Sequence, residues 1–347
     1  MDIGPVIDAD AKTTIERHIE SMRAKGRRVY RHTGSDVPAE GTFVRPALIE
    51  LDSFEDLHRE VFGPVLHVMR FERHDLQALV DQINTLGYGL TLGLHTRIDE
   101  TITEVVERAR VGNVYVNRNI VGAVVGVQPF GGEGLSGTGP KAGGPLYLLH
   151  LLSSRPAPAA RDAILSQADA KGSISSAAAA SCPLATLRDW AVAAGKHDFA
   201  AVCEAAHRHS PRGLSCILTG ATGEQNTYRT LPRARVLCLA VDEDDLLAQF
   251  AAVLAVGSVA AWPLDSERLL QRLPQALRTH VDLVEDWTDP VAFFDAAICH
   301  GDIERLMAVS RSLAERQGPI VSLTAMRPGE SRVPLERLVV ERALSVN

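Results

Sequence analysis

Apolar residues recur every three or four positions in three segments of the first half of the chain, and this spacing predicts amphipathic helices. Each segment follows an aspartate that can cap a helix and precedes a glycine that can end one: Asp10 and Gly26, Asp75 and Gly87, Asp99 and Gly112. The residues that we expect to face inward are Ile15, Ile19 and Met22 in the first helix, Leu76, Leu79, Val80, Ile83 and Leu86 in the second, and Ile102, Val105, Val106 and Ala109 in the third. Runs rich in β-forming residues lie at Phe43–Ile49, Val65–Phe71, Leu90–Thr96 and Asn113–Asn117. The alternation predicts an α/β layer architecture.

The chain changes character in its middle. Arg155–Ala160 and Gly172–Ser181 are rich in proline, alanine and serine and lack a periodic apolar face. We therefore place a linker at 154–182, between one domain at 1–153 and a second at 183–347. The second domain opens with two helical patterns, Leu184–Ala194 and Phe199–His207, and continues as another α/β unit.

Composition excludes several classes of protein. The 347 residues are enough for about two domains, and 46% apolar with 23% charged residues is ordinary for a globular protein. The net charge of −7 predicts no nucleic-acid-binding face. Apolar runs such as Phe250–Val256 are far too short to predict a membrane span.

The five cysteines all lie at or beyond Cys182, without C-x-x-C spacing. We interpret them as reduced thiols of a cytoplasmic protein rather than a disulfide framework or a zinc site. We expect Cys203 and Cys299 on helices, Cys216 and Cys238 on strands, and all four as buried structural residues. A second group, His197, Cys203, His207 and His209, is interpreted as a solvated helix end, so we expect no metal site.

The densest chemical signal is the glycine-rich segment Pro129–Pro145, which holds seven glycines. Such a loop can grip an anion through its main-chain N–H groups, although a mobile surface loop is the alternative interpretation. The glycines Gly132, Gly134 and Gly137 match a G-x-G-x-x-G fingerprint, but prolines flank the loop where that fingerprint needs a strand and a helix. A phosphate-binding P-loop is excluded too, because Lys141 does not follow a glycine at the required spacing.

A family resemblance supports the interpretation of this segment as an anion-binding loop. Residues 2–152 resemble the last third of an aldehyde dehydrogenase through DIGPVID at Asp2–Asp8, FVRPALIE at Phe43–Glu50, EVFGPV at Glu60–Val65, GNVYVNR at Gly112–Arg118 and PFGG at Pro129–Gly132. The continuation GLSGTGPKAGGP is similar to the bifunctional proline utilization A (PutA) family, within its L-glutamate γ-semialdehyde dehydrogenase module. The resemblance implies NAD as cofactor and L-glutamate γ-semialdehyde, formed from 1-pyrroline-5-carboxylate, as substrate. FAD would belong to a proline dehydrogenase module outside this segment.

The same resemblance assigns site residues. Glu60 would bind the nicotinamide ribose hydroxyls and Phe62 would lie beside the nicotinamide, the alternatives being a solvated acid at a strand edge and a core aromatic. The loop that anchors the α-carboxylate of the substrate would comprise Phe130, Gly131, Gly132, Glu133 and Ser136. Lys141 is interpreted either as a residue that shapes the pocket or as a surface charge.

The second domain resembles the NAD-binding domain of the same superfamily, at Gly220–Arg229 and Leu231–Leu239. Its chemistry is expected to be lost. Trp262 stands where the family has a lysine that grips the cofactor, and Met326 stands where it has the general-base glutamate; a thioether cannot take a proton from water. We therefore expect a degenerate, non-catalytic Rossmann-like domain, and the resemblance to the PutA family implies that this domain covers the active site.

No catalytic residue is assigned within this chain. In the family the nucleophilic cysteine lies upstream of DIGPVID, so we expect a segment cut at both ends that is inactive alone and needs the rest of the dehydrogenase module as partner. Homo-oligomerisation stays open. The alternatives are a non-catalytic interaction protein, a complementing subunit of a split aldehyde dehydrogenase, and a different aldehyde dehydrogenase subfamily.

Overall fold

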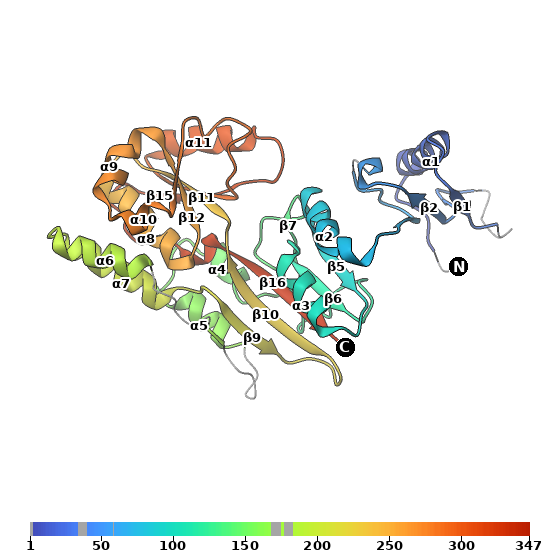
Figure 1. The fold of residues 1–347 in the computed structure, drawn as a ribbon, viewed down its shortest axis with the longest axis horizontal. Helices are drawn as coiled ribbons and strands as arrows, with labels where there is room; N and C mark the ends of the chain where they lie inside the picture. The colour runs from blue at the N-terminus through green and yellow to red at the C-terminus, as the bar shows by residue number, and fades with distance from the viewer. Residues whose placement is uncertain (1–2, 34–39, 58, 168–174, 177–182) are drawn as a thin grey trace. The chain divides into compact units, whose positions relative to one another are not determined.

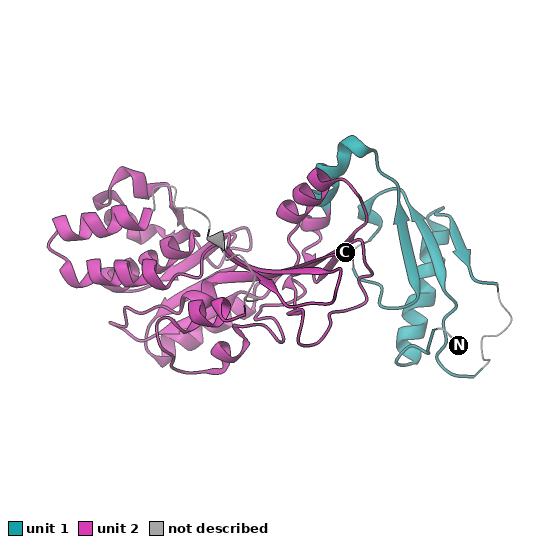
Figure 2. Cartoon of the chain, turned by 90° about the horizontal axis from the view of Figure 1, so that it is seen from below, with its two compact units in different colours: residues 1–82 teal, residues 83–347 magenta. Residues whose placement is uncertain are grey.

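The computed structural model describes residues 3–33, 40–57, 59–167, 175–176 and 183–347. Its contacts divide the chain into two compact units, residues 1–82 and 83–347, which are described separately (Figure 2). The linker that we place at 154–182 stays a prediction, and most of its second half lies outside the described residues. Residues Ala159–Leu165 of that linker form helix α5, with Ala160 and Ile164 buried.

The first unit is one helix packed against a small sheet. Helix α1 (Ala9–Ala24) covers strands β1 (Val29–Arg31), β2 (Ala47–Leu51) and β3 (Val65–Met69), which lie in that order. The expected inward face is confirmed, since Ile15, Ile19 and Met22 are almost fully buried. The helix begins earlier than expected: Asp8, not Asp10, is the cap, and its carboxylate accepts the Ala11 N–H at 2.7 Å. Single-turn 3₁₀ helices lie at Phe54–Asp56 and Arg73–Asp75.

The second unit contains a mixed sheet that joins distant parts of the sequence. Within the described residues its strand order is β5 (Thr91–Leu94), β6 (Asn113–Val116), β16 (Val339–Val346), β10 (Gln225–Pro232), β9 (Leu214–Leu218) and β8 (Ser175–Ser176). Strand β16 runs parallel to β6 and antiparallel to β10 (Figure 1). The two predicted domains therefore contribute strands to one sheet.

The expected helices of this region are present with shorter strands between them. Helix α2 (Leu76–Thr85), which begins in the first unit and ends in the second, and helix α3 (Asp99–Arg108) match the periodic segments, and the short helix α4 (Tyr147–Leu151) follows. In α2 only Val80 is fully buried, and the other expected inward residues are half-buried. In α3, Val105 and Val106 are buried as expected.

The C-terminal part carries a five-stranded parallel sheet in the order β13 (Val281–Val284), β12 (Val259–Pro263), β11 (Arg235–Leu239), β14 (Ala296–His300) and β15 (Ser322–Met326). In chain order this is 3-2-1-4-5, the arrangement of a doubly wound Rossmann sheet. The helices around it are α6 (Pro183–Ala193), α7 (His197–His209), α8 (Glu243–Val256), α9 (Glu267–Arg272), α10 (Gln275–Arg278) and α11 (Ile303–Ala314). The expected α/β fold with a Rossmann-like second part is confirmed.

Trp262 and Met326, which we interpret as substitutions for functional residues of the family, both lie in the core of this part. Trp262 on β12 is fully buried, with its ring edge-to-face against Phe250 of α8 at 5.2 Å between centroids. Met326 ends β15 and is 2% exposed. Each side chain therefore packs the interior.

Four cysteines can be placed. Cys203, Cys216 and Cys238 lie on α7, β9 and β11 as predicted, but the prediction for Cys299 is wrong. Cys299 lies on β14, beside Leu239 of β11 and Ala325 of β15. All five β14 residues are buried, so the segment lacks the alternation that marks a strand in sequence.

Candidate functional site

The glycine-rich loop is an ordered hairpin-like structure at the edge of the second unit. Phe130 and Ala142 close its base by exchanging main-chain hydrogen bonds of 3.0 and 2.8 Å. Within it, strand β7 (Glu133–Gly134) pairs antiparallel with β4 (Tyr88–Gly89). The alternative of a mobile surface loop stays untested, although these main-chain pairs tie the segment to itself and to β4.

Two glycines are required by this packing. A Cβ on Gly132 would lie 2.6 Å from the Cβ of Ser136, closer than atoms can approach. Gly134 has a φ of 65° and faces the Gly87 carbonyl oxygen, which a Cβ would meet at 2.4 Å. The loop can therefore fold back on itself only because side chains are missing at these positions.

Lys141 belongs to the loop and is only 2% exposed, so the interpretation as a surface charge is wrong. Its ammonium group donates to the Asn113 side-chain oxygen at 2.8 Å and to the Gly131 carbonyl at 2.5 Å. Burial lowers the pKa of Lys141 to about 8, an effect opposed by the carboxylates of Glu341 and Glu133. A cation is thus held directly under the glycines.

Asn113 joins the base of the loop to strand β6. Its amide donates to the Pro129 carbonyl at 2.9 Å, and its oxygen accepts the Gly131 N–H at 3.2 Å. On the opposite side, the Ser136 hydroxyl accepts the Gly89 N–H at 3.1 Å. Asn113 lies in the GNVYVNR motif, but nothing in the sequence indicated which carbonyl it would hold.

Two carboxylates of the loop region are neutralised or buried. Glu133 forms an ion pair with Arg342 at 2.7 Å. Glu341 accepts the Lys141 main-chain N–H at 2.9 Å and the Tyr228 hydroxyl at 2.7 Å, and burial raises the pKa of Glu341. Tyr228, Glu341 and Arg342 were missed by sequence reasoning because they lie on β10 and β16, far along the chain.

The loop leaves main-chain donors available. The N–H groups of Gly132, Thr138 and Gly139 form no hydrogen bond with any described residue. A cavity of about 30 Å³ lies on the inner side of the loop, large enough for one or two water molecules. Its lining includes Gly132, Thr138, Lys141, Arg233 and Glu341.

The other predicted site residues belong to the first unit. Glu60 and Phe62 are exposed, Phe62 to 86%, so the core alternative for Phe62 is wrong. Glu60 precedes β3 and is not part of a strand. A Cβ on the following Gly63 would meet the Ile15 side chain at 2.4 Å, which packs this turn onto α1. The structure therefore describes the two halves of the predicted site in separate units.

Rossmann-like sheets bind dinucleotides at the switch point of the strand order, beyond the carboxyl ends of the first and fourth strands. Here the Gln249 amide donates to the Leu239 carbonyl at 2.9 Å and contacts Nδ1 of His300 at 2.7 Å. Nε2 of His300 lies 2.8 Å from the Glu330 carbonyl oxygen. Gln249 and His300 are buried, so the chain itself fills this position.

The turn after β11 reads Ala240-Val241-Asp242, without the glycines that let a pyrophosphate approach the backbone. The C-terminal sheet therefore does not fit NAD. Glu60 and Phe62 are both exposed, so their side chains are accessible to a ligand, and their assignment to the nicotinamide end stays a prediction.

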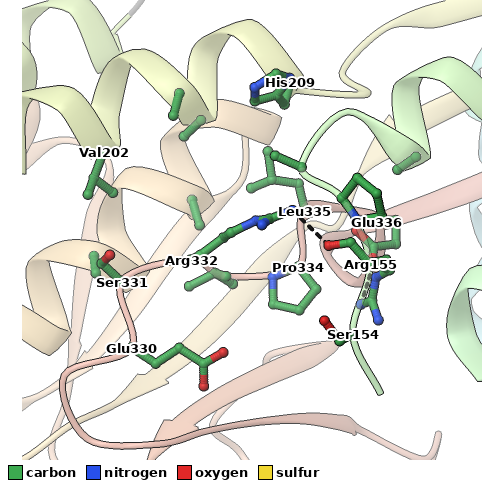
Figure 3. Close-up of a pocket in the computed structure, with 18 of the residues that line it drawn as sticks. Ser154, Arg155, Val202, His209, Glu330, Ser331, Arg332, Pro334, Leu335 and Glu336 are labelled. Carbon is green, nitrogen blue, oxygen red and sulfur yellow. Dashed lines mark hydrogen bonds and ion pairs between the residues drawn. The ribbon is translucent and has the colours of Figure 1, made fainter. Parts of the chain in front are cut away.

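A larger cavity of about 460 Å³ lies between helices α7 and α8 and the segments 153–160 and 330–336 (Figure 3). Alanines make up much of its helical wall, among them Ala201, Ala205, Ala248 and Ala252. Arg155 forms an ion pair with Glu336 beside it, and Arg332 donates to the Arg155 carbonyl at 2.8 Å. The sequence did not indicate this cavity, because the proline-rich segment that lines it lies in the predicted linker.

The four described cysteines are the candidate nucleophiles of the chain. Burial raises the pKa of the thiols of Cys203, to about 12, and of Cys216, Cys238 and Cys299, so these thiols stay protonated. Cys182 lies outside the described residues. Among the residues that the structure places, no three histidine, cysteine or acidic side chains converge on a metal position. None of the described helices has the length and apolar character to cross a membrane.

Residues 1–155 match the aldehyde dehydrogenase family. Over its whole length the chain is 53% identical to the bifunctional protein PutA of Escherichia coli (strain K12), of which it covers 27%. The chain matches a C-terminal portion of PutA proteins. It is also 40% identical over 152 residues, 43% of its length, to the 1-pyrroline-5-carboxylate dehydrogenase 2 of Bacillus subtilis (strain 168), of which it covers 29%.

The fold agrees with this match. The structure of PutA from Corynebacterium freiburgense aligns with 96% of the chain at a TM-score of 0.64 and 22% identity, covering 30% of that protein. The chain thus spans between a quarter and a third of the length of these PutA relatives. It includes the part that matches the aldehyde dehydrogenase family and the Rossmann-like part that follows.

Proposed function

We propose that the chain forms the end of an NAD-dependent L-glutamate γ-semialdehyde dehydrogenase module in a bifunctional proline-catabolic protein. The observation that carries this proposal is the loop 129–145, in which Gly132, Thr138 and Gly139, whose N–H groups form no hydrogen bond with any described residue, line the same small cavity as the buried Lys141. Main-chain N–H groups and a nearby cation together favour a carboxylate. The substrate of this reaction carries an α-carboxylate at the end remote from its aldehyde.

The loop residues take different roles in this proposal. Gly132 offers its N–H to the carboxylate, and the Ser136 hydroxyl can donate its own proton because its oxygen already accepts from Gly89. Gly131 shapes the loop, since its N–H and carbonyl are both engaged. Phe130 walls the pocket. Glu133 would repel a carboxylate, but Arg342 compensates its charge.

Glu60 and Phe62 hold the nicotinamide end of the cofactor in this proposal. A nicotinamide cofactor supplies the hydride acceptor that aldehyde oxidation needs. The carboxylate of Glu60 accepts hydrogen bonds from ribose hydroxyls, and Phe62 offers its exposed ring to the nicotinamide. The buried thiols of the chain suit a reducing, cytoplasmic compartment.

We further propose that the 347-residue chain alone does not turn over. Its four described thiols are buried with raised pKa values, and Met326 cannot act as a base. The test is calorimetric titration of the chain with NAD, together with an assay of semialdehyde-dependent NADH formation, with a complete PutA as positive control. We expect no turnover from the chain and NADH from the control. Turnover by the chain would overturn the proposed inactivity.

The anchoring role has a separate test. Glutamate, which keeps the α-carboxylate of the substrate, is titrated into chain labelled for NMR. We expect shifts at the amides of Gly132, Thr138 and Gly139, and a weaker response in Lys141→Met. A Glu204→Gln change on the exposed face of α7 is the control. Shifts confined to other regions would contradict the proposed anchor.

A further inference from the structure

The glycine-rich loop is held from below by residues some 200 positions later in the chain. Strand β16 pairs in parallel with β6, with Ala343 opposite Asn113 and Leu344 opposite Val114. This register brings Glu341 and Arg342 under the loop, where they bind Lys141 and Glu133. Arg233, which follows β10, also donates to the Thr138 carbonyl at 3.3 Å.

Both oxygens of Glu341 are engaged. Oε2 accepts the main-chain N–H of Lys141 at 2.9 Å, and Oε1 accepts the Tyr228 hydroxyl at 2.7 Å. Tyr228 is fully buried on β10, which pairs with β16 at Tyr228 and Ala343. Because its phenol is fixed in the sheet, the carboxylate of Glu341 has one orientation.

The approach of Glu341 to the loop is close. A Cβ on Gly144 would lie 3.0 Å from Oε1 of Glu341. Lys141, the residue that Glu341 holds by its main chain, is the one whose ammonium group binds the Gly131 carbonyl. Lys141 therefore links the position of Glu341 to the position of Gly131.

We propose that Glu341, oriented by Tyr228, is a positioning residue for the anchor loop, so that strands β10 and β16 set where the carboxylate-binding N–H groups lie. A loop with seven glycines has many conformations of its own and loses much entropy when it is fixed. Contacts that fix it before the substrate arrives spare the substrate that cost. The inference rests on the proposed function for the role of the loop as a carboxylate anchor. The positioning of the loop by Glu341 does not depend on that role.

The mechanics are tested in the 347-residue chain by hydrogen exchange followed by mass spectrometry. Tyr228→Phe removes one hydrogen bond to Glu341, and Glu341→Gln removes the charge. We expect exchange in peptides from 130–142 to accelerate roughly tenfold in both variants. Peptides from β12 and β14 should keep their rates. Matched controls are Tyr147→Phe and Glu315→Gln, at exposed positions on α4 and after α11.

The consequence for binding is tested in a complete dehydrogenase that carries this segment. There we expect the same two variants to raise the KM for the aldehyde at least fivefold and to leave kcat and the KM for NAD within twofold. A simple loss of folded enzyme would lower kcat instead. The inference would be overturned if hydrogen exchange in the loop did not change, or if it accelerated equally in the loop and in the reference strands. It would also be overturned if exchange in the loop accelerated while the KM for the aldehyde stayed the same. Failure of wild-type anchoring in the glutamate titration would count against the proposed function while leaving the exchange result intact.

Discussion

The main-chain N–H of Lys141 donates to the side chain of Glu341 at 2.9 Å, although 200 residues separate the two. This contact joins the aldehyde dehydrogenase segment to the last strand of the chain. The ammonium group of the same lysine holds the glycine-rich loop, so one buried residue links both parts.

The stability of the chain should depend on pH through Lys141. Its pKa is about 8 when folded and about 10.5 when unfolded. Between these values the unfolded chain binds more protons, so the contribution of Lys141 to stability rises as pH rises from about 8 to 10.5. We expect the difference in unfolding free energy between wild type and Lys141→Met to shift in favour of wild type over that range. Urea unfolding at pH 7, 8.5 and 10 measures it; a difference that stays constant would contradict the lowered pKa.

Gly132→Ala should disrupt the loop. The added Cβ would clash with the side chain and carbonyl of Ser136, and we expect a loss of about 1–3 kcal/mol of stability with weaker glutamate binding. Gly122→Ala is the matched control, because nothing lies within 4 Å of a Cβ there and its backbone is not left-handed. Thermal unfolding and the NMR titration provide the measurements. Equal effects of the two substitutions would show that the loop does not need its glycine.

Trp262→Ala should cost about 3–5 kcal/mol, because it leaves a cavity beside Phe250 in the core. Val241→Ala, at a position 83% exposed, should change stability by less than about 0.5 kcal/mol. Chemical denaturation of both variants tests the difference. A small effect of Trp262→Ala would mean that the tryptophan is not a packing residue.

Arg155→Ala should destabilise the wall of the larger cavity. The change leaves Glu336, 6% exposed, as a buried carboxylate without its partner, and we expect a loss of about 3–5 kcal/mol. The exposed pair Arg272 and Glu243 offers a comparison, since Arg272→Ala should cost at most about 1 kcal/mol. Unfolding curves at low and high salt distinguish the two, because only the exposed pair is screened by ions. Similar costs for both would contradict the burial of the Arg155 pair.

Sequence patterns predicted the helices well and the strands less well. The inward faces of α1 and α3 follow from residues spaced by one helical turn, a local property. Strand β14 was misread at Cys299 because a strand buried on both faces has no alternation to reveal it. The cap of α1 was misplaced by two residues, since several aspartates near the helix start can serve.

The sequence by itself determined the α/β class, the glycine-rich loop and the match to aldehyde dehydrogenase motifs, because these depend on residue type and local spacing. Only the tertiary structure decided that Lys141 is buried, that Tyr228 and Glu341 lie under the loop, and that His300 and Gln249 close the Rossmann-like sheet. Each of these depends on strand pairing between residues far apart in the chain. Such pairing is fixed by the whole fold, so no local pattern records it.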